Sequence, residues 1–205
     1  QIIDEFTDAT GIDAGASTNE RLTSGVYDGT STVTPTVTED ADDSGVDGDY
    51  TWYKWTDTAA TGSYDNDTTQ DHEYLIVGGG GSGGTWHPGG GGAGGLLTAT
   101  GLSLTGGNEY TVTVGAGGAA VTTSNGNNGG DSILSGTGIS TLTAGGGGAG
   151  CKADTAGGAG RATNGNGGGG GYYGVSGGAG NGAGFAGGVG TGGSPQYGGG
   201  GGGGA

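Results

Sequence analysis

The chain has 205 residues, 62 of them glycine, and a formal net charge of −16 with only four lysines and arginines. Collagen is excluded, because it needs glycine at every third position and abundant proline, whereas this chain has three prolines and unbroken glycine runs. Nucleic-acid binding is excluded for lack of clustered cations, and membrane insertion for lack of an apolar run of about 20 residues.

Glycine and acidic residues divide the chain. Only 7 of the 62 glycines but 17 of the 20 acidic residues precede residue 78. This shift predicts an acidic, β-rich N-terminal or attachment region at 1–71 and a glycine-rich domain at 72–205. Because the chain starts at a glutamine and stops just after a glycine run, we expect it to be part of a longer protein.

The first half predicts three strands. Residues 30–38 alternate β-branched side chains around Pro35, which predicts an edge strand. Residues 49–57 (DYTWYKWTD) carry aromatic side chains on both faces, which predicts a strand covered on both sides or one at a subunit interface. Residues 72–77 (HEYLIV) end in a continuous apolar run, which is typical of a buried strand.

Short strands also separate the glycine runs of the second half. Residues 96–104 and 109–114 predict a hairpin around Gly106-Gly107-Asn108, with Tyr110 in the core. Residues 131–134 and 139–143 predict a similar pair. An α-helix is not expected beyond residue 78, because glycine costs about 1 kcal/mol per helical position relative to alanine.

The glycine runs have no side chains to bury, so their order needs another source of free energy. Polyglycine can form an extended helix with about three residues per turn and no internal hydrogen bonds. Such helices hydrogen-bond sideways to one another where glycine permits close approach. We therefore predict an all-β fold with short antiparallel strands, essentially no α-helix and a bundle of polyglycine II helices. Residues 177–193 are expected on its outside and 198–204, including Gly201, on its inside.

A known family shares this order of segments. Residues 74–84 (YLIVGGGGSGG), 89–97 (GGGGAGGLL), 109–118 (EYTVTVGAGG), 129–132 (GGDS) and 143–148 (TAGGGG) resemble the glycine-rich domain of bacteriophage tail-fibre adhesins and related virion proteins. The resemblance covers residues 72–205. It implies a polyglycine II sandwich at a virion surface, outside the cell, whose loops touch host receptors. Residues 1–70 do not match the fibre-attachment domain of those adhesins.

Catalytic chemistry is poorly supported. No HExxH, CxxC or GxSxG motif with strand context occurs, and GxGxxG matches carry no information in so glycine-rich a chain. We therefore expect no enzyme, not even a polysaccharide depolymerase, and no cofactor. His72 is expected at a solvated strand edge. Cys151, the only cysteine, is expected to be a small packed residue, with a reactive thiol or an intermolecular bridge as the alternative.

The acidic stretch 39–49 (EDADDSGVDGD) is a possible calcium loop. Asp40, Asp42 and Ser44 match the opening of an EF-hand loop, but Thr51 stands where the bidentate glutamate belongs and flanking helices are missing. A solvated acidic loop is the expected structure, and a weak calcium site of another geometry is the alternative.

Bulky residues that interrupt the glycine-rich segments are the candidates for receptor binding, because sterics exclude them from a glycine bundle. They are Trp86, His87, Tyr172, Tyr173, Phe185, Gln196 and Tyr197. The expected partners are a host-surface protein or glycan and other virion or fibre subunits, with the chain a homo-oligomer or part of an oligomeric fibre. The alternative is a purely structural filament or capsid-decoration subunit without a ligand.

Overall fold

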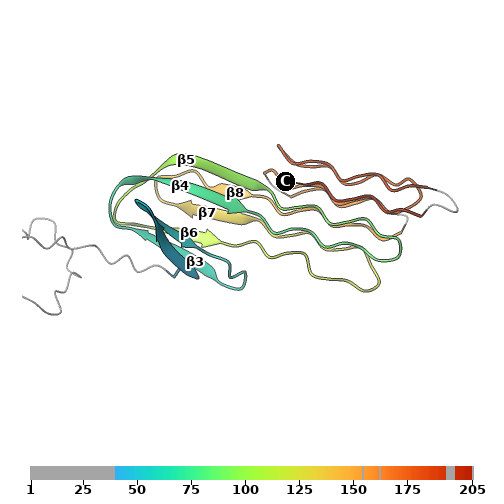
Figure 1. Ribbon diagram of the computed structural model, residues 1–205, viewed down its shortest axis with the longest axis horizontal. Coiled ribbons are helices and arrows are strands. Elements are labelled where there is room, and N and C mark those ends of the chain that lie inside the picture. The colour runs from blue at the N-terminus through green and yellow to red at the C-terminus, as the bar shows by residue number, and fades with distance from the viewer. Residues whose placement is uncertain (1–39, 154, 162, 193–196, 205) are drawn as a thin grey trace, which may run out of the picture. The chain divides into compact units, whose positions relative to one another are not determined.

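The computed structural model describes residues 40–153, 155–161, 163–192 and 197–204, which fall within one compact unit, Thr38–Ala205. The described residues form short antiparallel strands and long extended segments, without any helix (Figure 1). This confirms the predicted all-β class. Accordingly, no helix in these ranges could cross a membrane. The edge strand expected at 30–38 lies outside the described residues.

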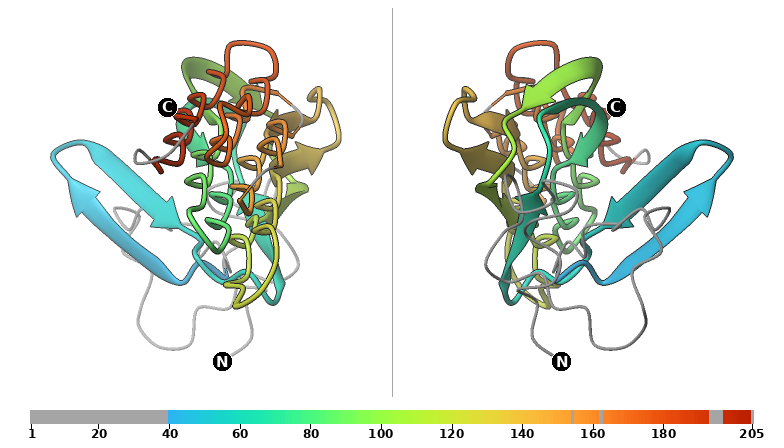
Figure 2. Two further views of the ribbon diagram at one scale, coloured as in Figure 1. Left: turned by 90° about the vertical axis from the view of Figure 1, so that its right-hand side faces the viewer. Right: turned by 90° about the vertical axis from the view of Figure 1, so that its left-hand side faces the viewer.

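The first two strands form a separate hairpin. β1 (Asp43–Asp47) pairs antiparallel with β2 (Tyr50–Lys54), and Gly48 adopts a φ of 60° in the two-residue turn. The hairpin lies to one side of the other sheets (Figure 2). Val46 is 73% exposed, Tyr50 65% and Trp52 40%. The prediction that this aromatic strand is covered on both sides was therefore wrong within this chain.

The remaining strands form two packed sheets. A four-stranded sheet has the order β3-β6-β7-β8, and a two-stranded ribbon pairs β4 with β5. The ribbon contacts β7 and β8. The strands are β3 (Thr61–Asn66), β4 (Gln70–Val77), β5 (Leu96–Leu104), β6 (Asn108–Thr113), β7 (Ser132–Gly136) and β8 (Leu142–Ala144).

The pairing confirms one predicted hairpin and corrects the other. β7 and β8 pair as expected. The predicted hairpin of 96–104 with 109–114 was wrong, because β5 pairs with β4 and β6 lies between β3 and β7. The glycine-rich segments 78–84 and 89–95 run antiparallel to each other, so they return the chain beside β4 before β5 begins. Since β3 also pairs with β6, a division at 71/72 would separate two strands of one sheet.

The core lies between these sheets. Tyr110 is fully buried, as predicted, and its hydroxyl accepts a 2.8 Å bond from the Thr105 amide. Asn66, also buried, joins the sheets by donating 2.9 Å to the carbonyl of Leu104. The prediction that residues 72–77 form a buried strand needs correction. β4 is not wholly buried, since Leu75 is 66% and Val77 52% exposed on its outer face.

Beyond the sheets, glycine-rich segments run side by side (Figure 1). We call them the bundle. Residues 78–84 and 89–95 connect β4 to β5, and 115–119 and 126–130 connect β6 to β7. After β8 the chain runs back and forth through 145–151, 155–161, 165–171, 175–181, 184–190 and 198–204.

Backbone hydrogen bonds between these segments recur at every third residue. The amides of Gly78, Gly81 and Gly84 donate to the carbonyls of Gly95, Gly92 and Gly89 at 2.8, 2.8 and 3.2 Å. The amides of Gly79 and Ser82 instead donate to residues 130 and 127 of a different segment. Successive amides therefore point in different directions, and each segment bonds sideways to several neighbours.

Segment 165–171 lies at the centre of the bundle. All of its residues are buried. It exchanges backbone hydrogen bonds with segments 89–95, 145–151, 155–161, 175–181, 184–190 and 198–204. A Cβ on Gly168 would overlap the carbonyl oxygen of Ala149, far inside the 3.0 Å limit of real Cβ contacts. Only glycine fits this closely packed position.

The inner segment was predicted incorrectly. Gly201 is exposed, and a Cβ there would meet nothing within 4 Å. Segment 198–204 lies at the edge of the bundle, where its backbone bonds join it to 89–95, 165–171 and 184–190. An unbroken glycine run thus does not by itself identify the centre, because position depends on how many segments surround it.

Along one side of segment 145–151, side-chain oxygens accept the backbone amides in place of the carbonyls of a further glycine-rich segment. The amides of Gly146, Ala149 and Lys152 donate to the side-chain oxygens of Asp131, Asn128 and Asn125 at 2.8, 2.7 and 2.7 Å. Both sets are spaced by three residues. We call Asn125, Asn128 and Asp131 the side-chain ladder. It supplies protein acceptors to amides at the surface of the bundle.

Candidate functional site

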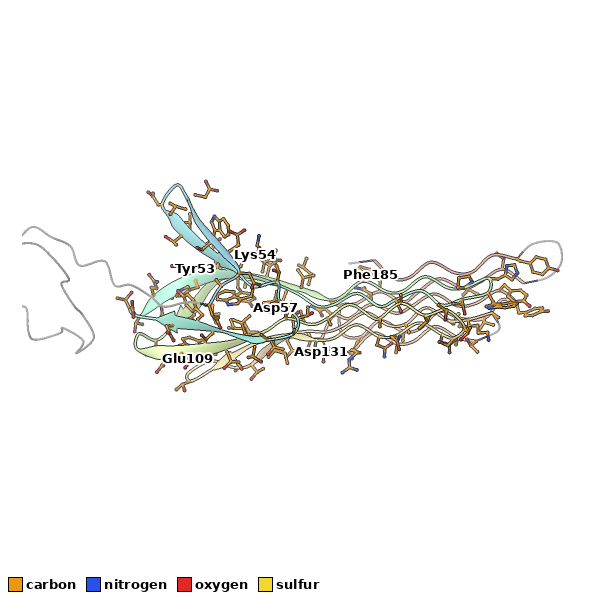
Figure 3. All side chains as sticks on the ribbon, turned by 90° about the horizontal axis from the view of Figure 1, so that it is seen from below. Tyr53, Lys54, Asp57, Glu109, Asp131 and Phe185 are labelled. Carbon is orange, nitrogen blue, oxygen red and sulfur yellow. The ribbon has the colours of Figure 1, made fainter. Side chains whose placement is uncertain are left out.

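The turns farthest from the sheets gather at one end of the bundle (Figure 3). Because the segments alternate in direction, every second turn falls at this end. We call these turns the tip loops; their described residues are 85–88, 120–125, 152–153, 172–174, 191–192 and 197. Glycine-rich segments far apart in the sequence thereby bring bulky residues together.

Aromatic rings of the tip loops form one cluster. The Tyr172 ring lies 5.3 Å from His87, 4.1 Å from Tyr173 and 5.5 Å from Tyr197, measured between centroids. His87 also lies 5.4 Å from Tyr197. Trp86, beside His87 in the chain, is 70% exposed, and Tyr173 and Tyr197 are 60% and 49% exposed. The cluster is therefore held together by its own contacts yet remains open on its outer side.

Three residues of these loops have a strained backbone. Trp86, His87 and Tyr173 have φ values of 60°, 54° and 53°, in the left-handed region that costs side-chain-bearing residues about 1 kcal/mol or more each. This strain persists because the surrounding structure holds the loops. The amide of Ala153 donates a 3.1 Å hydrogen bond to the carbonyl of Trp86, and the amide of Thr191 donates a 2.8 Å hydrogen bond to the carbonyl of Gly198.

The predicted receptor-binding residues divide into three groups. Trp86, His87, Tyr172, Tyr173 and Tyr197 lie together in the tip loops. Phe185 lies part-way along the bundle and takes no part in the cluster (Figure 3); its ring is 64% exposed while its amide donates 2.6 Å to buried Asn166. Gln196 lies outside the described residues.

A model of the glycine-rich domain family matches residues 56–205, most of the chain. The chain belongs to the glycine-rich domain family. No curated protein and no solved structure shows a significant match. The family match begins within the region predicted as N-terminal and includes β3, which agrees with the pairing of β3 and β6.

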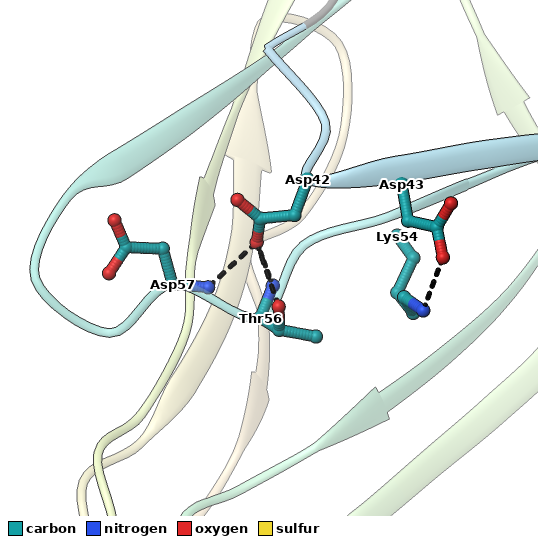
Figure 4. A network of polar contacts seen from close by, with 5 residues as sticks. All are labelled: Asp42, Asp43, Lys54, Thr56 and Asp57. Carbon is teal, nitrogen blue, oxygen red and sulfur yellow. Dashed lines mark hydrogen bonds and ion pairs between the residues drawn. The ribbon is translucent and has the colours of Figure 1, made fainter.

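The calcium candidates of this glycine-rich domain lie at the base of the β1–β2 hairpin. The Asp42 carboxylate accepts bonds from the amides of Thr56 and Asp57 and from the Thr56 hydroxyl (Figure 4). Asp40 accepts from the Trp55 indole at 3.1 Å and the Ser63 amide at 2.6 Å. Ser44 lies within β1. The two carboxylates thus tie the hairpin to the chain around β3, and the described ranges hold no group of three acidic, histidine or cysteine side chains placed to bind a metal.

Hydrogen bonds lower the pKa of these carboxyls below the ordinary value of 3.8. For Asp40 the main cause is the Ser63 amide, and for Asp42 it is the Thr56 amide, followed by that of Asp57. The bond from Lys54 lowers the pKa of Asp43. In each case the donors stabilise the charged form. The carboxyls therefore remain ionised while they anchor the hairpin.

His72 and Cys151 are both packed in the structure. His72 is half-buried rather than solvated, with its Nε2 2.8 Å from the Tyr64 hydroxyl and its ring 5.4 Å from the Tyr64 ring. Cys151 is buried, and its thiol donates 3.1 Å to the carbonyl of Gly169. The Cys151 contact agrees with the expected small packed residue, and the expectation of a solvated histidine was wrong.

Sequence reasoning identified the bulky residues but not which of them meet. The cluster forms because the bundle segments alternate in direction, so that the loops holding His87, Tyr172 and Tyr197 meet at one end. Only the fold reveals this arrangement. The side-chain ladder was also missed. Its signal was present, because Asn125, Asn128 and Asp131 repeat at the three-residue period expected of the glycine helices.

Proposed function

We propose that this glycine-rich domain is a non-enzymatic adhesive module of a bacteriophage tail fibre or fibre tip. In this proposal its bundle segments are polyglycine II helices and its tip loops contact a receptor on the host surface. The module would then act outside the cell, on the virion surface, beside other fibre subunits. The observation that carries the proposal is the partly exposed aromatic cluster on a hydrogen-bonded glycine bundle.

The backbone geometry supports polyglycine II helices. Lateral bonds at every third residue are what a threefold helix without internal hydrogen bonds requires. Within the described bundle, glycine φ values fall in the left-handed region only at Gly174 and Gly182, both at turns. Glycine adopts either sign of φ easily, so the restriction of positive φ to these turns is consistent with regular helices between them.

The tip geometry supports recognition. Tyrosine and tryptophan supply large contact areas with few rotatable bonds. Tyr172 and Tyr173 are fixed on a loop that follows the fully buried segment 165–171. A binding surface whose loops are already ordered loses less conformational entropy when it binds. Such a surface suits adhesion better than catalysis.

One observation favours the alternative of a purely structural subunit. The exposed side chains of the β1–β2 hairpin, Val46, Tyr50 and Trp52, would be buried by a neighbouring subunit. An isolated two-stranded hairpin is only marginally stable in water. A subunit contact at the hairpin is compatible with adhesion at the tip, whereas a purely structural role requires the tip loops to be covered as well.

The test is binding of the fluorescently labelled chain to a panel of bacterial strains. The double variant Tyr172→Ala/Tyr173→Ala is expected to weaken binding to a recognised strain by about tenfold or more, as interface aromatics do when truncated. Its melting temperature should fall only modestly, because Tyr173 is mostly exposed and the contacts that Tyr172 makes with three rings lie within the tip loops rather than in the bundle.

Phe185→Ala is the matched control, since it removes a similarly exposed ring away from the tip loops. It should leave cell binding unchanged. Normal binding by the double tyrosine variant, or equal loss in the Phe185 variant, would contradict adhesion through the tip loops.

A further inference from the structure

A polar groove opens on the side of the bundle next to the tip loops. Residues 126–128 line one wall, Ala156 and Gly158 the other, and Ala149 and Gly150 lie between them. Its volume is about 340 Å³, and its lining includes Asn125, Asn127 and Asn128. That volume falls at the lower end of the usual range for small-ligand sites, about 300–1,000 Å³.

The groove is where segment 145–151 lacks a further glycine neighbour. The side-chain ladder takes over that neighbour's role by accepting the amides of Ala149 and Lys152 through the oxygens of Asn128 and Asn125. The Thr155 hydroxyl lies 2.8 Å from the Asn125 oxygen and 2.7 Å from the Lys152 carbonyl, and it shares its one hydrogen between these two acceptors. Each carboxamide is therefore fixed in orientation through its oxygen.

Because the side-chain oxygens of Asn125 and Asn128 already accept backbone amides, their NH2 groups remain available to a ligand. Among the described residues, the exposed side-chain nitrogens of Asn125 and Asn128 have no protein acceptor. The groove thus offers two side-chain donors held by backbone bonds to their oxygens. Two donors three residues apart along a threefold helix are separated by about 9 Å.

The lining also limits the chemistry of a ligand. It contains no ionisable side chain and no apolar one larger than alanine. A charged ligand would lose hydration without an opposite charge to compensate, and an apolar ligand would find no apolar surface. A neutral ligand rich in hydroxyl oxygens matches the fixed amide donors.

We propose that this groove binds a short segment of a neutral saccharide, with Asn125 and Asn128 as hydrogen-bond donors. The inference rests on the proposed adhesive function and assigns a ligand class to a surface beside the tip loops. The saccharide lies between the two walls, and the small side chain of Ala156 leaves it room.

The experiment titrates the full chain with neutral disaccharides and trisaccharides of glucose, galactose and mannose, following the asparagine side-chain amides by nuclear magnetic resonance. Sialyllactose and an uncharged proline-rich peptide serve as the acidic and peptide probes. At least one neutral saccharide should shift the amide signals of Asn125 and Asn128. Ala156→Leu, which fills the groove, should weaken that binding by about tenfold or more.

Asn128→Asp sharpens the test, because it keeps the oxygen that accepts from Ala149 and replaces only the donor. It should lose saccharide binding to a similar extent. The matched control is Asn164→Asp, whose side-chain oxygen likewise accepts a backbone amide, that of Ala183, outside the groove. This control should bind within about twofold of the unchanged chain.

The proposal is overturned if no neutral saccharide shifts these signals, if only sialyllactose or the peptide does, or if binding survives Ala156→Leu. Cell binding distinguishes this failure from that of the proposed function. Strain recognition without saccharide binding overturns the groove alone. Saccharide binding by a chain that recognises no strain supports the groove and counts against adhesion.

Discussion

Replacing Gly168 by alanine is the most direct perturbation of the bundle. The added Cβ would overlap the carbonyl oxygen of Ala149, which cannot move freely because it accepts a 2.7 Å bond from the Gly158 amide. Segments 145–151 and 165–171 must therefore separate. Two backbone bonds that join these segments are then at risk, from the Gly148 amide to the Asn166 carbonyl at 2.7 Å and from the Cys151 amide to the Gly169 carbonyl at 3.3 Å.

The magnitude follows from those bonds. Each buried backbone group left without a partner costs about 1–3 kcal/mol, so two broken bonds cost roughly 2–6 kcal/mol. Alanine restricts the unfolded chain and returns about 0.4–1 kcal/mol. The net loss remains a large share of the roughly 5–15 kcal/mol that stabilises a typical domain.

Gly201→Ala is the matched control. Its Cβ meets nothing within 4 Å and its φ lies outside the left-handed region, so the same substitution should be neutral or slightly stabilising. Urea unfolding followed by tryptophan fluorescence measures both variants, with Trp86 reporting on the tip. Equal stability of the two variants would refute the distinction between central and edge glycines.

Further predictions concern the side-chain ladder and the hairpin base. Asn128→Ala removes the acceptor of the Ala149 amide at the surface of the bundle and should lower the free energy of unfolding by about 0.5–1.5 kcal/mol. Asn128→Asp should retain most of that stability, and equal losses of the two variants in urea unfolding would contradict this role. The lowered pKa of Asp42 means that its contribution is complete above the unfolded-state value near 3.8 and is lost as the pH falls through the lower folded-state pKa. Acid should therefore increase proteolysis of the β1–β2 hairpin, and Asp42→Asn should reduce that pH dependence; an unchanged pH profile would contradict the anchoring role.

Local patterns predicted the strands well because they depend on neighbouring residues. The two-residue alternation around Tyr110 and the pair formed by β7 and β8 were read correctly. Alternation also explains the error at β4, where an apolar run exposes Leu75 while its neighbours face the core.

Long-range arrangement could not be predicted from the same patterns. Gly168 and Gly201 both lie within unbroken runs of glycine, and only the number of segments that surround each of them in the fold distinguishes the two positions. The partner of β5 depends on the return path through 89–95 rather than on the short turn before β6. Likewise, Phe185 and Tyr172 both interrupt glycine-rich segments, yet only Tyr172 falls at a tip turn.

Cryo-electron microscopy of the assembled particle tests the proposed adhesive role most directly. The proposal predicts that the outer faces of Trp86, Tyr173 and Tyr197 remain free at the particle surface, whether or not the β1–β2 hairpin is buried between subunits. Tip loops buried against a neighbouring subunit would contradict adhesion through them and support the structural alternative.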